Sequence, residues 1–451
     1  MKLATGRSGT AGGTTLSVDG TVIHRFLGIL YAEAPQRFRP PAPAAPRPGV
    51  LDCTGPGPAA PQNPESPAPP GTLPRRWSED GCLNLNIWTP GTGGPGRPVL
   101  VWIHGGAYLS GANSDAMYDG GALAAATGTV VVAINYRLGA LGFLNLAELL
   151  GPGYEDSSNV ALLDQLEALR WVRDNIAGFG GDPGNVTVFG ESAGAAAIGT
   201  LLGMPASEGL FRRAILQSGT AERFRTPEVS ARMAREFLTL CGLDARSVRD
   251  ILTLPVAGLL EAQEELGRRT ARETFAVPLP FQPTAGIPSL PRPPLEAVRQ
   301  GLNGSVDLLL GTNLNEGSFS VEMRPAGPAD PDYPERAAAV LAAAGIVPGR
   351  TAGYAEALSR VLSAEPGGKV LLEAAFLTRG QAPQELSHAM SGAWAAFART
   401  GSPGLPGLDW PEYGPERNTM VLDAAPRVEQ DPRREIREFF AANQVSRQPG
   451  R

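Results

Sequence analysis

One pentapeptide constrains the fold of this chain more than any other feature, namely Gly190-Glu191-Ser192-Ala193-Gly194. It follows a short apolar run at residues 186–189 and precedes a helix-compatible stretch at residues 195–202. A serine on such a sharp turn from strand to helix has strained backbone geometry, and its hydroxyl stands exposed above a sheet. The position also lies at a helix N-terminus, where the potential is positive. The pattern predicts that Ser192 is a nucleophile, whereas an isolated pentapeptide of this kind would indicate only a glycine-rich turn.

The apolar runs along the chain predict a parallel sheet. Short apolar runs bounded by turn residues are typical of strands that are buried on both faces. They occur at residues 85–88, 99–103, 129–135, 186–189, 213–217 and 306–310, with helical stretches at 160–176 and 383–400. Because strands alternate with helices, we expect an α/β fold with a mostly parallel sheet. No internal repeat or clean break divides the sequence, so a single domain over residues 1–451 is expected.

A proline-dense segment at residues 39–74 lacks any apolar periodicity. Proline fixes the backbone and removes a hydrogen-bond donor, so such a stretch does not extend a helix or a central strand. We expect an irregular segment that lies on the surface of the folded body.

A second glycine-rich loop follows the run at residues 99–103 and reads His104-Gly105-Gly106-Ala107-Tyr108. Loops of this HGG type supply backbone donors to a developing oxyanion, and small residues let the amides reach the substrate. We expect the donors of this oxyanion hole to be the amides of Gly106, Ala107 and Ala193. The alternative is a plain tight turn after a buried strand.

Composition and charge exclude some partners without naming one. The chain has a net charge of -6, with 42% apolar and 19% charged residues, which gives no reason to expect nucleic acid or an anionic membrane. Without a signal-peptide-like run or roughly 18 uninterrupted apolar residues, a cytoplasmic location is expected. Cys53, Cys82 and Cys241 are too few for a disulfide framework or a zinc site, which favours reduced structural thiols. The sequence does not indicate an oligomeric state.

Further motifs run along most of the chain. They are Phe26-Leu27-Gly28-Ile29, Arg37-Phe38, Ser78-Glu79-Asp80, Cys82-Leu83-Asn84-Leu85-Asn86, Val101-Trp102-Ile103-His104-Gly105-Gly106, Asn135-Tyr136-Arg137-Leu138-Gly139, Phe179-Gly180-Gly181-Asp182-Pro183, Gln217-Ser218-Gly219, and Trp394 with Phe397-Ala398-Arg399-Thr400-Gly401. Together they closely resemble the type B carboxylesterase family, which includes bacterial para-nitrobenzyl esterases and the cholinesterases. The resemblance implies an α/β-hydrolase fold and a serine esterase that acts on a small-molecule carboxylic ester without metal or organic cofactor.

The resemblance also implies an acidic residue that orients the catalytic base. In this family it lies in a G-T-N-x-x-E-G loop after a late strand, and the matching residues here are Gly311-Thr312-Asn313-Leu314-Asn315-Glu316-Gly317. Glu316 is then the expected acid, and it follows Ser192 in the chain order that this fold uses. On the sequence alone, the alternative is that Glu316 is simply a solvated loop carboxylate.

The family histidine has no counterpart. The resemblance implies a loop of the type G-x-x-H-x-x-x-x-P-F-V-F, and this chain has no such segment. The stretch at residues 370–378 instead runs almost directly into the helix at 383–400. We therefore expect that several dozen family residues, including one late strand and the histidine loop, are missing. An exposed apolar groove or a disordered stretch is expected near residues 365–383.

Three histidines remain, and a base must come within hydrogen-bond reach of the serine hydroxyl. His24 lies in the N-terminal region, and His104 belongs to the oxyanion loop, which it is expected to hold in place. His388 lies on the helix at 383–400, on a side that is predicted to face solvent. The predicted core face is Leu386, Met390, Ala393, Trp394 and Phe397, and the side of His388 also carries Ser391, Gly392, Ala395 and Arg399. His388 and His104 stay as candidate substitutes for the missing base.

Two hypotheses from different classes follow. The first is a serine esterase that forms an acyl-enzyme on Ser192, with activity impaired by the absent histidine. The second is a catalytically inactive α/β-hydrolase-fold protein that binds a ligand or partner. A protein adapted to binding alone has no chemical reason to keep Ser192, Glu316 and the oxyanion loop. An internally deleted product that folds poorly is a third possibility.

Overall fold

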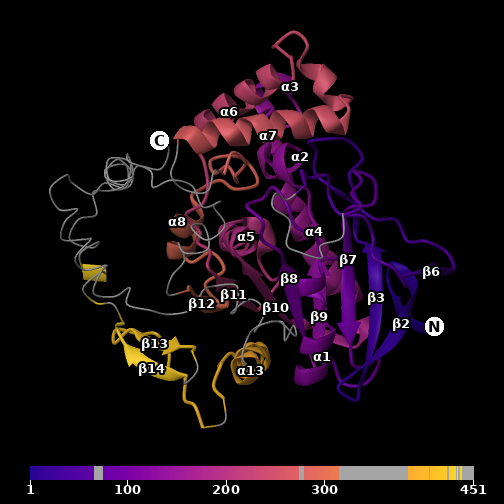
Figure 1. The fold of residues 1–451 in the computed structure, drawn as a ribbon, viewed down its shortest axis with the longest axis vertical. Coiled ribbons are helices and arrows are strands. Elements are labelled where there is room, and N and C mark those ends of the chain that lie inside the picture. The colour runs from indigo at the N-terminus through magenta and orange to yellow at the C-terminus, as the bar shows by residue number, and fades with distance from the viewer. Residues whose placement is uncertain are drawn as a thin grey trace, which may run out of the picture.

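In the part of the chain that the structure describes, a central sheet of ten strands forms the middle of the computed structural model (Figure 1). The structure describes residues 1–64, 75–273, 279–313 and 384–432 without 406, 424 and 425, together with residues 434, 437 and 438. In spatial order the strands are β1 (Lys2–Gly6), β2 (Gly9–Val18), β3 (Thr21–Leu30), β7 (Asn84–Thr89), β9 (Val130–Ile134), β8 (Arg97–Ile103), β10 (Gly181–Glu191), β11 (Arg213–Gln217) and β12 (Asp307–Gly311), with β6 (Val50–Asp52) beside β2. Smaller sheets pair β4 (Ala32–Glu33) with β5 (Ala42–Pro43) and β13 (Asn418–Val421) with β14 (Arg427–Gln430).

The sheet is mixed. From β9 to β12 all neighbouring strands are parallel, as the alternation of strands and helices predicts. From β1 to β9 the neighbours are antiparallel, and this half was not predicted. The sequence feature that indicates this antiparallel half is the pair Asp19 and Gly20 between β2 and β3. These two residues have φ of 47° and 81°. An Asp-Gly pair with positive φ at both residues is typical of a two-residue β-hairpin turn.

Helices cover both faces of the sheet. They are α1 (Gly121–Thr127), α2 (Gly139–Phe143), α3 (Ala147–Leu150), α4 (Val160–Asn175), α5 (Ala193–Leu201), α6 (Pro227–Leu240), α7 (Val256–Glu273), α8 (Pro294–Arg299) and α13 (Gln384–Thr400). Successive residues of β8 face opposite sides, so Val101 packs in the cluster that contains α4 and α5, whereas Trp102 packs with α1 and α13. No helix in the described ranges is long and apolar enough to cross a bilayer.

The predicted core face of α13 is confirmed, and its predicted exposed side is confirmed in part. Leu386, Met390, Ala393, Trp394 and Phe397 are all buried. His388 is exposed, as expected. Ser391 and Ala395, which were predicted to share the exposed side, are buried instead. The predicted groove and the missing strand at residues 365–383 lie outside the described residues.

The proline-rich segment is only partly a surface segment. Residues 45–50 are exposed, as predicted, but residues 59–62 are buried. Gln62 is 3% exposed, donates from Nε2 to the Gly111 carbonyl at 3.1 Å, and accepts from the Gly111 amide at 3.0 Å. The prediction is therefore wrong at residues 59–62, where a polar side chain satisfies backbone groups of another loop. It is also wrong at β6, which is not irregular but pairs with β2 in the central sheet. Residues 65–74 lie outside the described part.

A buried ion pair joins the segment after β9 to helix α4. Arg137 and Asp164 are 5% and 0% exposed, and two guanidinium nitrogens bond the carboxylate at 2.8 and 2.6 Å. The Arg137 amide also donates to this carboxylate at 3.1 Å. Such bidentate geometry compensates much of the desolvation cost, whereas removal of one partner leaves a buried charge unpaired.

The substitution Arg137→Met is expected to lower the free energy of unfolding by about 3–5 kcal/mol, because the Asp164 carboxylate then stays buried without its partner. Urea unfolding followed by circular dichroism measures this loss. Arg173→Met is the matched control, since Arg173 is 49% exposed beside Asp174 and its loss should cost less than about 1 kcal/mol. Equal losses in the two variants would contradict the assignment.

The cysteines are free thiols, and Cys53 and Cys82 are buried. Burial raises the pKa of Cys82 to about 12 and that of both Cys53 and Cys241 to about 11. Because the thiolate is the reactive form, very little of it is present at neutral or mildly alkaline pH.

We therefore expect that iodoacetamide labels the native protein slowly at pH 8 and labels all three cysteines rapidly once the chain is unfolded in urea. The half-buried Cys241 should be the first to react, since access also limits labelling. Mass spectrometry of the labelled peptides measures the order. Rapid native-state labelling of Cys82 would contradict its burial.

Candidate active site

The structure places Ser192 between the end of β10 and the start of α5. Its φ of 53° and ψ of −120° are rare for a residue with a side chain, and such conformations cost about 1–3 kcal/mol unless the surroundings enforce them. The Ser192 amide donates to the Gln217 carbonyl at 2.9 Å, and its carbonyl accepts from the Ala196 amide at 2.9 Å. The serine stands at the carboxyl edge of the parallel strands, where open α/β sheets bind ligands.

Three glycines let the backbones meet at this turn. A Cβ atom on Gly194 would lie 2.0 Å from the Ile103 carbonyl oxygen, and one on Gly190 would lie 2.7 Å from the same atom. A Cβ on Gly219 would lie 2.4 Å from Ala195 Cβ. Contacts below 3.0 Å require a shift of the surrounding atoms. Glycine at these positions therefore fixes the close approach of β8, β10 and α5.

The loop after β8 runs beside Ser192. A Cβ atom on Gly105 would lie 3.3 Å from Ser192 Cβ. Gly106, Ala107 and Tyr108 have φ of 103°, 57° and 61°, so the backbone turns sharply here. Among the described residues, the amides of Gly106 and Ala107 donate to no other backbone group. Ala193 is the first residue of α5, and a helix leaves its first four amides without an internal acceptor. The three predicted donors thus lie on the two segments that flank Ser192.

His104 is held within this loop. Its Nδ1 lies 2.9 Å from the Gly105 carbonyl, and its ring stacks on Tyr136 at a centroid distance of 4.5 Å. The Tyr136 hydroxyl donates to the His104 carbonyl at 2.7 Å. A Cβ atom on Gly111 would lie 2.4 Å from His104 Nδ1, so this glycine packs directly against the imidazole. These contacts support the role expected for His104, which is to hold the loop.

The other histidines lie elsewhere. His24 is on β3 and its Nδ1 lies 3.0 Å from Thr15 Oγ1, and His388 is exposed on α13. All three histidines of the chain belong to the described residues. No hydrogen bond between an imidazole and the Ser192 hydroxyl occurs in that part of the chain.

Glu316 lies outside the described residues, but the chain can be followed to within three residues of it. Strand β12 ends at Gly311, whose carbonyl accepts from the Ser218 amide at 2.8 Å. Asn313 Nδ2 then donates to Ser218 Oγ at 3.4 Å. The chain therefore leaves β12 at the same edge of the sheet as Ser192, beside the residues that follow β11.

Three side chains at this site were not predicted from the sequence. Tyr136 and Gln62 position the loop after β8. No sequence pattern indicates this role, although Tyr136 belongs to the motif Asn135-Tyr136-Arg137-Leu138-Gly139. The third is Glu191, which was considered only as part of the pentapeptide. Its Oε2 would lie 2.8 Å from a Cβ atom on Gly105, so the carboxylate faces the same loop as Ser192.

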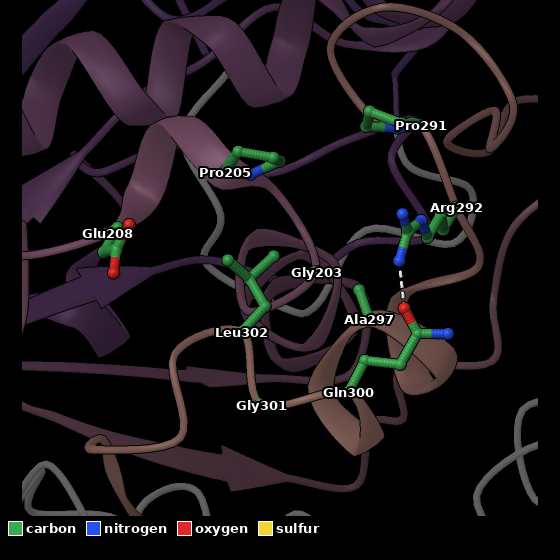
Figure 2. Close-up of a pocket in the computed structure, with 9 residues that line it drawn as sticks. All are labelled: Gly203, Pro205, Glu208, Pro291, Arg292, Ala297, Gln300, Gly301 and Leu302. Carbon is green, nitrogen blue, oxygen red and sulfur yellow. Dashed lines mark hydrogen bonds between the residues drawn. The ribbon is translucent and has the colours of Figure 1, made fainter.

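A surface cavity of about 450 Å³ lies elsewhere (Figure 2). Its lining residues are Gly203, Pro205, Glu208, Pro291, Arg292, Ala297, Gln300, Gly301 and Leu302. Helix α5 has nine residues and is therefore about 13 Å long. It begins directly after Ser192, and Gly203 lies beyond its carboxyl end. The cavity is therefore separate from the nucleophile.

Comparisons with known proteins agree with these features. The carboxylesterase family model matches residues 2–361. The para-nitrobenzyl esterase of Bacillus subtilis (strain 168) is 36% identical over 476 residues, which covers 93% of this chain and 96% of that protein. The acetylcholinesterase of Leptinotarsa decemlineata is 33% identical over 344 residues, which covers 69% of this chain and 54% of that protein.

Solved structures are similar over nearly the whole chain. A carboxylesterase of Geobacillus stearothermophilus superposes with a TM-score of 0.81 at 32% identity, covering 98% of this chain and 100% of that one. A PNB esterase superposes with a TM-score of 0.82 at 34% identity, covering 97% and 99% of the two chains.

The substitution Gly194→Ala tests the close approach at the turn. The added methyl group meets backbone atoms of β8, which cannot rotate away, so we expect a loss of about 1–3 kcal/mol in the free energy of unfolding. Gly267→Ala on α7 is the control, since nothing lies within 4 Å of its Cβ position, and it should stabilise by about 0.5–1 kcal/mol. Urea unfolding measures the free energy of unfolding of both variants. If Gly194→Ala left this free energy unchanged, the close contact with the Ile103 carbonyl would be contradicted.

Proposed function

Because this chain belongs to the carboxylesterase family, we propose that it hydrolyses small-molecule carboxylic esters through an acyl-enzyme on Ser192, without a metal or organic cofactor. The observation that carries this proposal is the strained Ser192 at the end of β10, beside a loop of small residues. A strained turn of this kind presents the hydroxyl to a substrate above the sheet.

In the proposed reaction Ser192 Oγ attacks the acyl carbon of the ester. The carbonyl oxygen becomes an oxyanion, which accepts hydrogen bonds from the amides of Gly106, Ala107 and Ala193. Donors that are fixed before the reaction stabilise this charge without reorganisation. In the described part of the chain, the amides of Gly106 and Ala107 donate to no other backbone group, which supports this assignment. Glu316 is the proposed acid, supported by the path of the chain from β12 to Asn313.

We propose that turnover is impaired because the family histidine is missing. The positions of His24, His104 and His388 support this. The alignment with the Bacillus protein is 476 positions long yet covers only 93% of this 451-residue chain, so several dozen positions have no counterpart here. The family model also ends its match at residue 361, before the helix α13. A serine without an imidazole is barely ionised at neutral pH and attacks slowly.

The alternative of an inactive binding protein is not favoured. The relatives and solved structures reported above are esterases and carboxylesterases, and the strained turn at Ser192 beside a loop of small residues also supports an enzyme. A single domain over residues 1–451 and a cytoplasmic location are part of the proposal. The packing of α13 against β8 and β10 through one apolar cluster supports the single domain.

With para-nitrophenyl acetate as substrate, we expect turnover below the ordinary enzyme range of about 1–10³ per second. Loss of a triad member can cost up to about 10⁶ in turnover, while the oxyanion hole and binding leave roughly 10³–10⁴ over water. Alkyl esters should react much more slowly, because their leaving groups are poorer. Ser192→Ala should abolish the activity.

His388→Ala is the matched control and should leave the rate unchanged, because His388 is exposed on α13. Turnover in the ordinary enzyme range that is lost in Ser192→Ala would defeat the impaired-enzyme proposal. If His388→Ala or His104→Ala then lost activity at unchanged stability, that histidine would be the base.

A further inference from the structure

We propose that the Glu191 carboxylate is the general base that activates Ser192 in this chain. The inference rests on the proposed function and names the group that accepts the serine proton. It starts from the geometry at Gly105, where the carboxylate and the nucleophile approach the same small space.

The Glu191 side chain lies beside Ser192 across the backbone of Gly105. A Cβ atom on Gly105 would lie 2.8 Å from Glu191 Oε2 and 3.3 Å from Ser192 Cβ. Glu191 Oε2 and Ser192 Cβ are therefore at most about 6 Å apart. One water molecule bridges a distance of this order between a base and the proton that it removes. Glu191 is only half-buried, so part of this residue is open to solvent.

The imidazoles of the chain do not offer a competing base at this position. The His104 ring is fixed between Tyr136 and Gly111, with Nδ1 on the Gly105 carbonyl. His24 is bonded to Thr15 on β3, and His388 is exposed on α13. Glu191 is adjacent to Ser192 in the chain, so the turn that positions the nucleophile also positions the carboxylate.

The step balances without any further reactant. A carboxylate oxygen of Glu191 takes a proton from the intervening water as that water takes the Ser192 proton and Oγ bonds to the acyl carbon. The carbonyl π electrons move to the oxyanion. The protonated Glu191 then returns the proton, through the water, to the leaving alkoxide as the ester C–O bond breaks. In the second half, Glu191 accepts a proton from the water that attacks the acyl-enzyme. It returns this proton to Ser192 Oγ as the bond between Oγ and the acyl carbon breaks, which releases the carboxylic acid and restores the Glu191 carboxylate.

The test compares Glu191→Gln and Glu191→Ala with the parent protein on para-nitrophenyl acetate. General base catalysis contributes about 10²–10⁴-fold, so both variants should lose at least about 100-fold in kcat with little change in KM. Added formate should restore activity to Glu191→Ala, because it brings a carboxylate into the space left by the side chain. Formate should not help Ser192→Ala. Glu208→Gln is the matched control and should keep the parent rate, because Glu208 lies seven residues beyond the carboxyl end of α5, at the surface cavity.

Each outcome decides. Ser192-dependent activity that survives in Glu191→Gln would overturn the base assignment while leaving the proposed function intact. Both variants could instead lose activity at unchanged thermal stability without rescue by formate. That result would assign Glu191 a positioning role and would also overturn the base assignment. A parent protein without any Ser192-dependent hydrolysis would overturn both proposals together.

Discussion

The close approach of three backbone segments at the turn after β10 determines the rest of this site. Gly190 and Gly194 lie against the Ile103 carbonyl, and Gly219 lies against Ala195. No side chain fits between these segments, so the positions of the strand ends and of the first turn of α5 are fixed together. The positive φ of Ser192 persists because its neighbours on both sides cannot relax. The nucleophile is therefore held by packing that exists before any substrate binds.

The loop after β8 depends on a second set of contacts behind it. Tyr136 supports the His104 backbone and ring, and Gln62 satisfies both backbone groups of Gly111. The adjacent Arg137 is anchored to Asp164 on α4. Buried polar networks of this kind are rigid when every member is satisfied. The orientation of the loop amides thus results from side chains on three distant parts of the sequence.

Sequence reasoning predicted the parallel half of the sheet well. Strand β11 begins and ends as expected, because a short apolar run bounded by polar residues has few alternatives. It missed β2, whose threonine and glycine residues form no apolar run and whose pairing depends on the turn at Asp19. The turn at Ser192 was predictable because local sequence dictates it. The direction of the Glu191 carboxylate was not, since it depends on how β8 approaches β10, which no local pattern encodes.

Two parts of the proline-rich segment at residues 39–74 would respond differently to changes in length. Residues 48 and 49 are exposed and lie just before β6, and an insertion there would add mainly loop entropy, which grows slowly with length. One residue inserted beside Gln62 would instead pull its amide away from Gly111 and release the rear of the loop beside Ser192. An inserted affinity tag is therefore compatible with the first site and not with the second, although both lie in the same proline-rich segment. Divergence in substrate range could thus begin at a residue that contacts no substrate.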